Sequence, residues 1–192
     1  GGGYTISGLN INKPETSALG RFGASGSTGN VRNPTVAGNI TGRGNTGGIA
    51  GFNQGTISGC TFRGEVTGNG SDTGGIAGSN YGLIAGCRVT ESTITGYDCV
   101  GGIAGWNPSS ATGIIACLAD DVTLKVTYEG TVYLGGIAGS NSAPLVACVA
   151  APTGMTSQGQ YTYAGGIAGV NWSTGTITTC YYQTGTDYSK AI

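Results

Sequence analysis

The sequence of 192 residues contains no histidine, one methionine and few charged side chains. Without histidine the chain by itself cannot form a Ser-His-Asp or Cys-His catalytic arrangement, and zinc sites that use histidine are excluded. Charged residues make up 9% of the chain, against about 25% in typical soluble domains. The net charge is −1 with no basic run, so we expect no nucleic-acid binding. No apolar run approaches the roughly 18 residues of a membrane-spanning helix, so we expect no membrane insertion.

Glycine is the residue that the chain has in excess, with 40 of 192 positions, whereas the usual share is about 7%. A collagen-like chain is excluded because the glycines have no strict three-residue period. Regularly placed Ile, Val and Cys residues argue against disorder, since periodic apolar residues can be stacked into a core. Glycine every few residues makes any helix unstable, so we expect an all-β chain.

One motif, Gly-Gly-Ile-Ala-Gly-x-Asn, occurs five times, beginning at residues 47, 74, 101, 135 and 165. A motif that recurs every 20–50 residues or so is typical of repeat proteins. We therefore predict a single parallel β-helix (β-solenoid) of about six coils, each of roughly 27–34 residues, over residues 1–192. In this interpretation residues 1–46 form a degenerate first coil and about 181–192 form a C-terminal cap. The preference for right-handed crossovers predicts a right-handed solenoid.

Stacked coils should align equivalent residues about 4.8 Å apart. We expect isoleucines to point inward, asparagines to form an amide stack at a corner, and cysteines to lie in line. The spacing also allows disulfides, but parallel side chains suit their geometry poorly, so buried thiols are the first interpretation and disulfides the alternative. The isoleucine ladder is Ile49, Ile76, Ile103, Ile137 and Ile167; the asparagine ladder is Asn53, Asn80, Asn107, Asn141 and Asn171; the cysteine ladder is Cys60, Cys87, Cys117, Cys148 and Cys180.

Within each coil we predict three short strands. In the coil that begins at residue 47, the first is Gly48–Gly51, the second contains Ile57 and the third begins at Cys60. Inward candidates farther along the third strand and its tail are Val66, Ile94, Val126 and Met155. In the first coil, Gly20–Gly23 is a degenerate copy of the motif, and Pro34 stands at the cysteine position.

These residues resemble the GLUG repeat, which has a Gly-Leu-x-Gly core followed by a G-x-I-x-x-C stretch. The match includes Gly48–Gly51 with Gly55–Cys60, and Gly75–Gly78 with Gly82–Cys87. One departure is Ala143-Pro144, which replaces the glycine before the aliphatic residue of the fourth copy. Proteins with this repeat are large bacterial surface and secreted proteins, including adhesin-like proteins and immunoglobulin-A-cleaving metallopeptidases, in which the repeats are not catalytic. The resemblance implies an extracellular β-solenoid at the bacterial cell surface, used for display or attachment.

Four aromatic residues next to the asparagine ladder are the candidate ligand contacts. Exposed rings at Phe52, Tyr81, Trp106 and Trp172 could shield the corner or form a platform on which sugars stack. We expect a non-enzymatic structural or adhesive segment without a cofactor, whose partner is a host or environmental glycan or protein surface.

Two alternatives remain open. The first is an extracellular filament subunit that assembles head to tail through open solenoid ends. The second is a glycan-active β-helix enzyme, for which Asp120-Asp121 is the one pair of adjacent acids.

Overall fold

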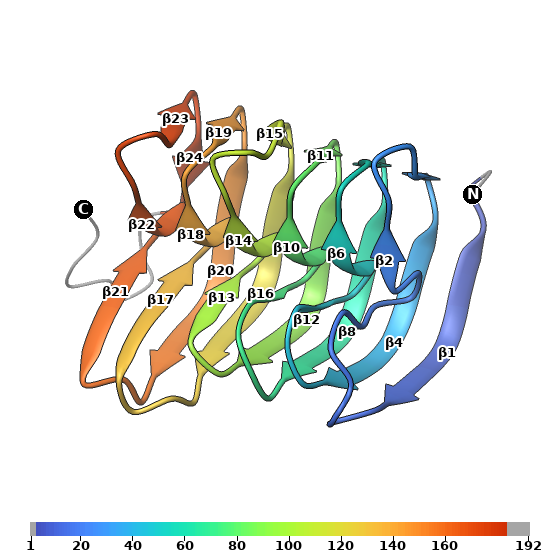
Figure 1. Cartoon of the computed structure of the whole chain (residues 1–192), viewed down its shortest axis with the longest axis horizontal. Helices are drawn as coiled ribbons and strands as arrows, with labels where there is room; N and C mark the ends of the chain where they lie inside the picture. The colour runs from blue at the N-terminus through green and yellow to red at the C-terminus, as the bar shows by residue number, and fades with distance from the viewer. Residues whose placement is uncertain (1–2, 184–192) are drawn as a thin grey trace.

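A computed structural model describes residues 3–183 and contains β-strands but no helix in that range. The strands form a parallel β-solenoid of about six turns, stacked side by side along the long axis (Figure 1). The predicted fold class is thereby confirmed, while its handedness stays a prediction. Across the described residues there is no helix of the length and apolarity needed to cross a membrane.

Each regular coil contains four strands, and not the three predicted. The coil that begins at the first complete motif consists of β5 (Thr46–Gly47), β6 (Ala50–Asn53), β7 (Thr56–Ser58) and β8 (Thr61–Gly68). The predicted first strand, Gly48–Gly51, is wrong because the chain bends sharply at Gly48 and Ile49 between β5 and β6. The glycines permit this bend where two backbones nearly touch. A Cβ at the equivalent Gly102 would lie 2.2 Å from the carbonyl oxygen of Gly136 in the next coil.

Every strand pairs in parallel with the equivalent strand of the next coil, which produces four sheets along the solenoid. Sheet A consists of β1 (Thr5–Asn12), β4 (Thr35–Gly42), β8, β12 (Arg88–Gly96), β16 (Leu118–Val126), β20 (Val149–Ser157) and β24 (Tyr181–Tyr182). Sheet B consists of β5, β9 (Thr73–Gly74), β13 (Cys99–Gly101), β17 (Thr131–Gly135) and β21 (Tyr161–Gly165). Sheet C consists of β2 (Ala24–Ser25), β6, β10 (Ala77–Asn80), β14 (Ala104–Asn107), β18 (Ala138–Asn141) and β22 (Ala168–Asn171). Sheet D consists of β3 (Asn30–Arg32), β7, β11 (Leu83–Ala85), β15 (Gly113–Ile115), β19 (Pro144–Val146) and β23 (Thr176–Thr178).

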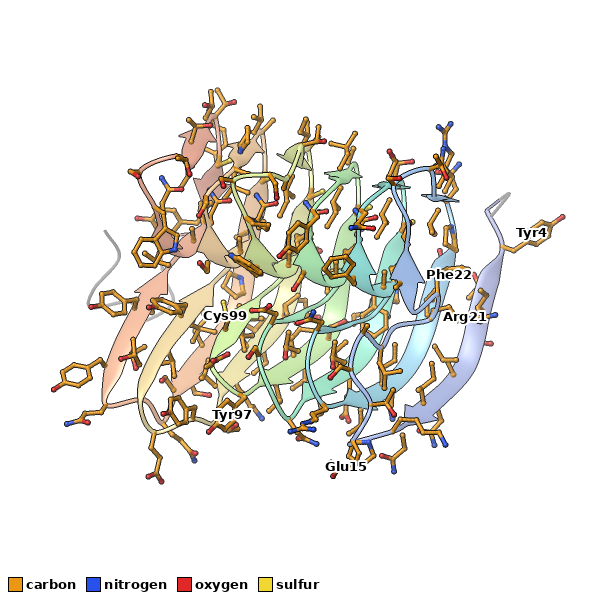
Figure 2. The ribbon with its side chains drawn as sticks, viewed as in Figure 1. Tyr4, Glu15, Arg21, Phe22, Tyr97 and Cys99 are labelled. Carbon is orange, nitrogen blue, oxygen red and sulfur yellow. The ribbon has the colours of Figure 1, made fainter. Side chains whose placement is uncertain are left out.

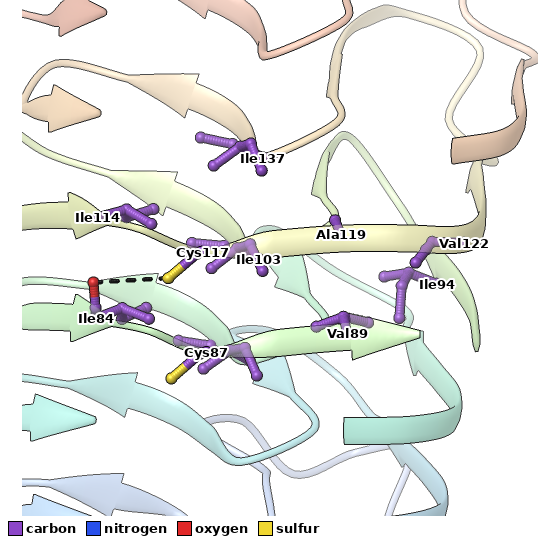
Figure 3. Packing of buried hydrophobic residues seen from close by; sticks show 14 of the residues in the cluster. Ile84, Cys87, Val89, Ile94, Ile103, Ile114, Cys117, Ala119, Val122 and Ile137 are labelled. Carbon is purple, nitrogen blue, oxygen red and sulfur yellow. Dashed lines mark hydrogen bonds between the residues drawn. The ribbon is translucent and has the colours of Figure 1, made fainter. Parts of the chain in front are cut away.

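The five motif isoleucines lie in the bends between sheets B and C and belong to one narrow apolar core, in which Figure 3 shows Ile103 and Ile137 in neighbouring coils. Four of them are fully buried, and Ile167 in the last coil retains 8% exposure. Because each coil covers the apolar face of the next, burial depends on neighbouring coils. In sheet A the aligned inward residues are Val66, Ile94, Leu124 and Met155. Leu124 therefore occupies the position predicted for Val126, which is also buried but lies two residues farther on.

The cysteine ladder consists of free thiols. Each Sγ donates to the carbonyl oxygen two residues earlier, as in the 3.3 Å contact from Cys117 to Ile115. Cys117 also lies 3.8 Å from the carbonyl oxygen of Ile84 in the preceding coil (Figure 3). The residue before each ladder cysteine has a positive φ, for example 58° at Gly86 and 52° at Ala116. This left-handed turn links sheet D to sheet A in each regular coil.

The two ends of the solenoid differ from the regular coils. Gly23 lies opposite Gly51, and Pro34 takes the place that Cys60 has in the next coil, as the degenerate first copy predicts. At the other end, the aromatic ring of Tyr182 lies against Gly166. Residues 184–192 of the predicted cap lie outside the described residues.

Candidate functional site

The asparagine ladder is a buried line of amides that joins five consecutive coils. Each amide nitrogen donates to the side-chain oxygen of the next asparagine, at 2.8 Å from Asn53 to Asn80 and at 2.7 Å from Asn107 to Asn141. Asn53, Asn80, Asn107 and Asn141 are fully buried. The ladder satisfies polar groups that could not otherwise bond inside the stack. We conclude that the ladder holds the coils together and that its four buried members present no surface to a ligand.

The four predicted aromatic residues flank this ladder, but they occupy two different register positions. Phe52 and Trp106 precede their asparagines, where two other coils have Ser79 and Ser140. Tyr81 instead follows its asparagine, and its ring lies 4.8 Å from that of Phe52 and 5.5 Å from that of Trp106. A large ring thus reaches over the coil whose own residue is a small serine. Three consecutive coils are covered by a continuous row of rings.

Trp172 repeats this arrangement near the C-terminal end. Its Nε1 donates to Ser140 Oγ at 2.9 Å, so the indole lies over the second serine position. Its ring also contacts Tyr133 of β17 at a centroid distance of 6.3 Å, and Tyr133 stacks on Tyr163 of β21 at 5.5 Å. The sequence interpretation missed both tyrosines. The sequence pattern around Tyr133 could have predicted its position. Val132 and Leu134 are apolar and buried in the core, and alternate residues of a strand point to opposite faces, so Tyr133 lies on the outer face.

We call these six residues the aromatic strip: Phe52, Tyr81, Trp106, Tyr133, Tyr163 and Trp172. Two members, Trp172 and Tyr163, are 48% and 52% exposed. The other four are half-buried, so the prediction that all four candidate rings are exposed is wrong for Phe52, Tyr81 and Trp106. The half-buried rings pack against each other and still present part of their surface to solvent.

A shallow cleft of about 290 Å³ interrupts the strip between Trp106 and Tyr133. We call it the acidic cleft because two carboxylates, Asp72 and Asp98, contribute to its lining. Figure 2 shows Cys99, which also lines it, in the middle of this face. The remaining lining residues are Ser71 and Ser140.

The electrostatics of the acidic cleft are unusual for so weakly charged a chain. Burial raises the pKa of Asp72 to about 6; the hydrogen bond that Ser79 Oγ donates at 2.8 Å opposes this, and the charge of Asp98 adds to it. Burial also raises the pKa of the Asp98 carboxyl and of the Cys99 thiol. The sequence interpretation missed this pair, because Asp72 and Asp98 belong to different coils. Their shared position just before a sheet B strand was the available signal.

The adjacent acids considered for an enzyme, Asp120 and Asp121, lie elsewhere, in β16 of sheet A. Asp120 accepts from Arg88 at 2.6 Å, and Arg63 pairs with Glu91 at 3.3 Å. Both pairs join neighbouring coils, and both arginines are about half exposed. Such exposed pairs are typical of a solvated face and contribute little to stability. Asp120 is therefore engaged in an ion pair.

Comparison with known proteins agrees with the resemblance. Residues 42–67 match the family described as the GLUG motif. The match spans the end of β4, all of β5 to β7 and most of β8, which amounts to one coil. Comparisons with curated proteins and with solved structures each found no match. The chain thus carries a GLUG motif in one coil of a β-solenoid, and the four coils that follow repeat that coil's motif in register.

Proposed function

We propose that the chain is an adhesive segment of a bacterial extracellular protein and that it attaches to glycans through the aromatic strip. The observation that carries this proposal is the presence of six aromatic rings on one face of five neighbouring coils. The β-solenoid and the GLUG motif are consistent with a structural repeat segment. An adhesive role at the cell surface follows from the resemblance to adhesin-like proteins and is the part that needs testing.

Aromatic side chains favour sugars because a ring face is apolar while pyranose hydroxyls keep their hydrogen bonds at the edge. Coils repeat about every 4.8 Å, and on each side of the acidic cleft the centroids of neighbouring rings in the strip lie 4.8–6.3 Å apart. A polymer of sugar rings could contact several of them at once, and the weak single contacts would add up. The low charge of the chain favours such stacking over ionic attachment.

The test is a glycan array probed with the full chain, followed by calorimetry on the glycans that bind. We expect Trp172→Ala to weaken binding by about tenfold, which corresponds to the loss of one stacking contact of about 1.4 kcal/mol. The matched control is Tyr128→Ala. Tyr128 is also exposed and stacked, on Tyr97 at 4.6 Å, but it lies outside the strip. Equal loss in both variants, or no glycan bound at all, contradicts the proposal.

Filament formation is the second candidate, and the two ends of the solenoid favour it. An apolar hollow of about 260 Å³ at the N-terminal end is lined by Ile6, Phe22 and Val31, among others. Another of about 250 Å³ at the C-terminal end includes Ile167 and Ile177. Unpaired strand edges beside apolar hollows can pair with another copy. Electron microscopy of the concentrated chain should then show filaments that Ile177→Glu abolishes, while short uniform particles in the parent chain contradict this candidate.

A further inference from the structure

The acidic cleft contains two carboxylates, which a platform for neutral sugars does not need. Its walls include the rings of Trp106 and Tyr133, and Asp72 and Asp98 lie between these walls. Both carboxylates come from turns that lead into sheet B, at β9 and β13. The strip approaches from both sides, with Phe52 and Tyr81 beside Trp106, and Trp172 beside Tyr133.

No cation within residues 3–183 balances these two carboxylates. The ion pairs in this range are Arg63–Glu91 and Arg88–Asp120, both on sheet A. Asp98 Oδ1 is buried and has no well-aligned hydrogen-bond partner within residues 3–183, although the backbone amides of Asp98 and Cys99 lie close enough to lower the pKa of the carboxyl and so to oppose part of the effect of burial. A buried polar atom without a partner is costly, and in native proteins such an atom commonly marks a functional role or a bound group. The part of the cleft that the structure describes is therefore short of positive charge.

We propose that the acidic cleft binds the protonated amino group of an amino sugar, within a glycan whose neighbouring rings stack on the aromatic strip. This inference rests on the glycan-binding function proposed above. An ammonium group supplies the positive charge that the carboxylates lack, and it brings three hydrogen-bond donors with it. Aromatic faces attract cations as well, so Trp106 and Tyr133 favour the same group. A neutral sugar would leave the negative charge of Asp98 without a positive partner.

The size of the cleft and its surroundings favour a sugar over a lysine side chain. A volume of about 290 Å³ lies just below the range for small-molecule sites, which is roughly 300–1,000 Å³, and so suits one ring of a polymer and not a whole oligosaccharide. A lysine side chain would use the cleft and leave the rings of Phe52, Tyr81 and Trp172 without a role. A glycan that carries amino groups uses the cleft and the strip together.

The test compares two oligomers of equal length, glucosamine tetramer and N-acetylglucosamine tetramer, by calorimetry with the full chain near neutral pH. We expect the amine form to bind at least about tenfold more tightly, since a charged hydrogen bond is worth about 1.5–3 kcal/mol. Asp98→Asn should reduce the affinity for the amine form to that for the acetylated form and leave the latter unchanged. Trp172→Ala should weaken both, and Tyr128→Ala neither.

The outcomes separate this inference from the proposed function. Equal binding of the two oligomers, or an unchanged preference in Asp98→Asn, overturns the amino-sugar site while glycan binding stands. Tighter binding of a lysine-rich peptide, sensitive to Asp98→Asn but not to Trp172→Ala, assigns the cleft to protein amines and also overturns it. Failure of both oligomers and of the glycan array overturns the proposed function itself.

Discussion

Asn107→Ala removes one interior rung of the asparagine ladder. The Nδ2 of Asn107 donates to Asn141 Oδ1 at 2.7 Å, and its Oδ1 accepts from Asn80 Nδ2 at 2.9 Å. Asn107 is 0% exposed, so water cannot replace these bonds without opening the stack. Alanine deletes two hydrogen bonds worth about 1 kcal/mol each, and it leaves Asn141 Oδ1 with a long 3.4 Å contact from the backbone of Ala143. We expect the free energy of unfolding to fall by about 3 kcal/mol.

Asn171→Ala is the matched control, because it makes the same chemical change at the end of the ladder. Asn171 Oδ1 accepts from Asn141 Nδ2 at 2.7 Å, and its own Nδ2 donates to the carbonyl oxygen of Gly175 at 3.0 Å. Its side chain is exposed, so water can occupy the vacated positions. The expected loss is below about 1 kcal/mol.

The assay is urea unfolding followed both by far-UV circular dichroism and by tryptophan fluorescence. Two probes are needed because a repeat array can lose coils one at a time, and coincident curves justify a single free energy. Trp106 reports on a central coil and Trp172 on the last one. Equal costs for the two alanine variants, or a cost of Asn107→Ala below about 1 kcal/mol, would refute the reasoning that burial makes the interior rung strong.

Four further predictions concern stability. Thr73 has a buried hydroxyl without a partner, at a position where the next coil has Val100, so Thr73→Val should raise the free energy of unfolding in urea by about 1 kcal/mol. Ala116 has a φ of 52°, so Ala116→Gly should stabilise by about 0.5–1 kcal/mol in the same assay. Ile103→Asp puts an unpaired charge in the core and should abolish the cooperative thermal melt, whereas Ile115→Asp, at a position 36% exposed, should not. Asp72 binds its proton more tightly in the folded chain, with a pKa of about 6 against about 3.9 unfolded. Stability should thus fall by about 3 kcal/mol in total as the pH rises from below about 4 to above about 6, and the difference between wild type and Asp72→Asn across that window measures it.

Inward positions could be read from the sequence because stacking imposes the same requirement on every coil. An isoleucine in one coil must be covered by an apolar residue in the next, and an amide at the corner needs another amide at the same place. Identical residues at Ile76 and Ile103, or at Asn80 and Asn107, follow from that requirement. The position of Pro34 could be read in the same way. The first coil aligns with the next one residue by residue, and Pro34 falls where the next coil has Cys60.

Features that depend on where a strand bends could not be read so directly. The Gly-Gly-Ile run looks like part of one strand in sequence, yet it divides β5 from β6, because only the packed structure shows how closely Gly102 approaches Gly136. The inward position that aligns with Ile94 was assigned to Val126 and not to Leu124, because the tails between motifs differ in length and the register cannot be counted along them. The acidic cleft was hidden because Asp72 and Asp98 are brought together by the stacking of coils and share no local motif.

Positions that stacking leaves free are where ligand binding is to be sought. The register position before the ladder asparagine holds Phe52, Ser79, Trp106, Ser140 and Val170 in successive coils. The core does not require one residue type there, since rings and serines alternate. In the two coils that have Ser79 and Ser140 at this position, the rings of Tyr81 and Trp172 cover the serine. The surface therefore carries an aromatic ring at these coils although the residue before the asparagine is not aromatic. The aromatic row is built from residues before the asparagine in some coils and after it in others. This indicates that the aromatic residues are there for the surface that they form together, and not for the packing of any one coil.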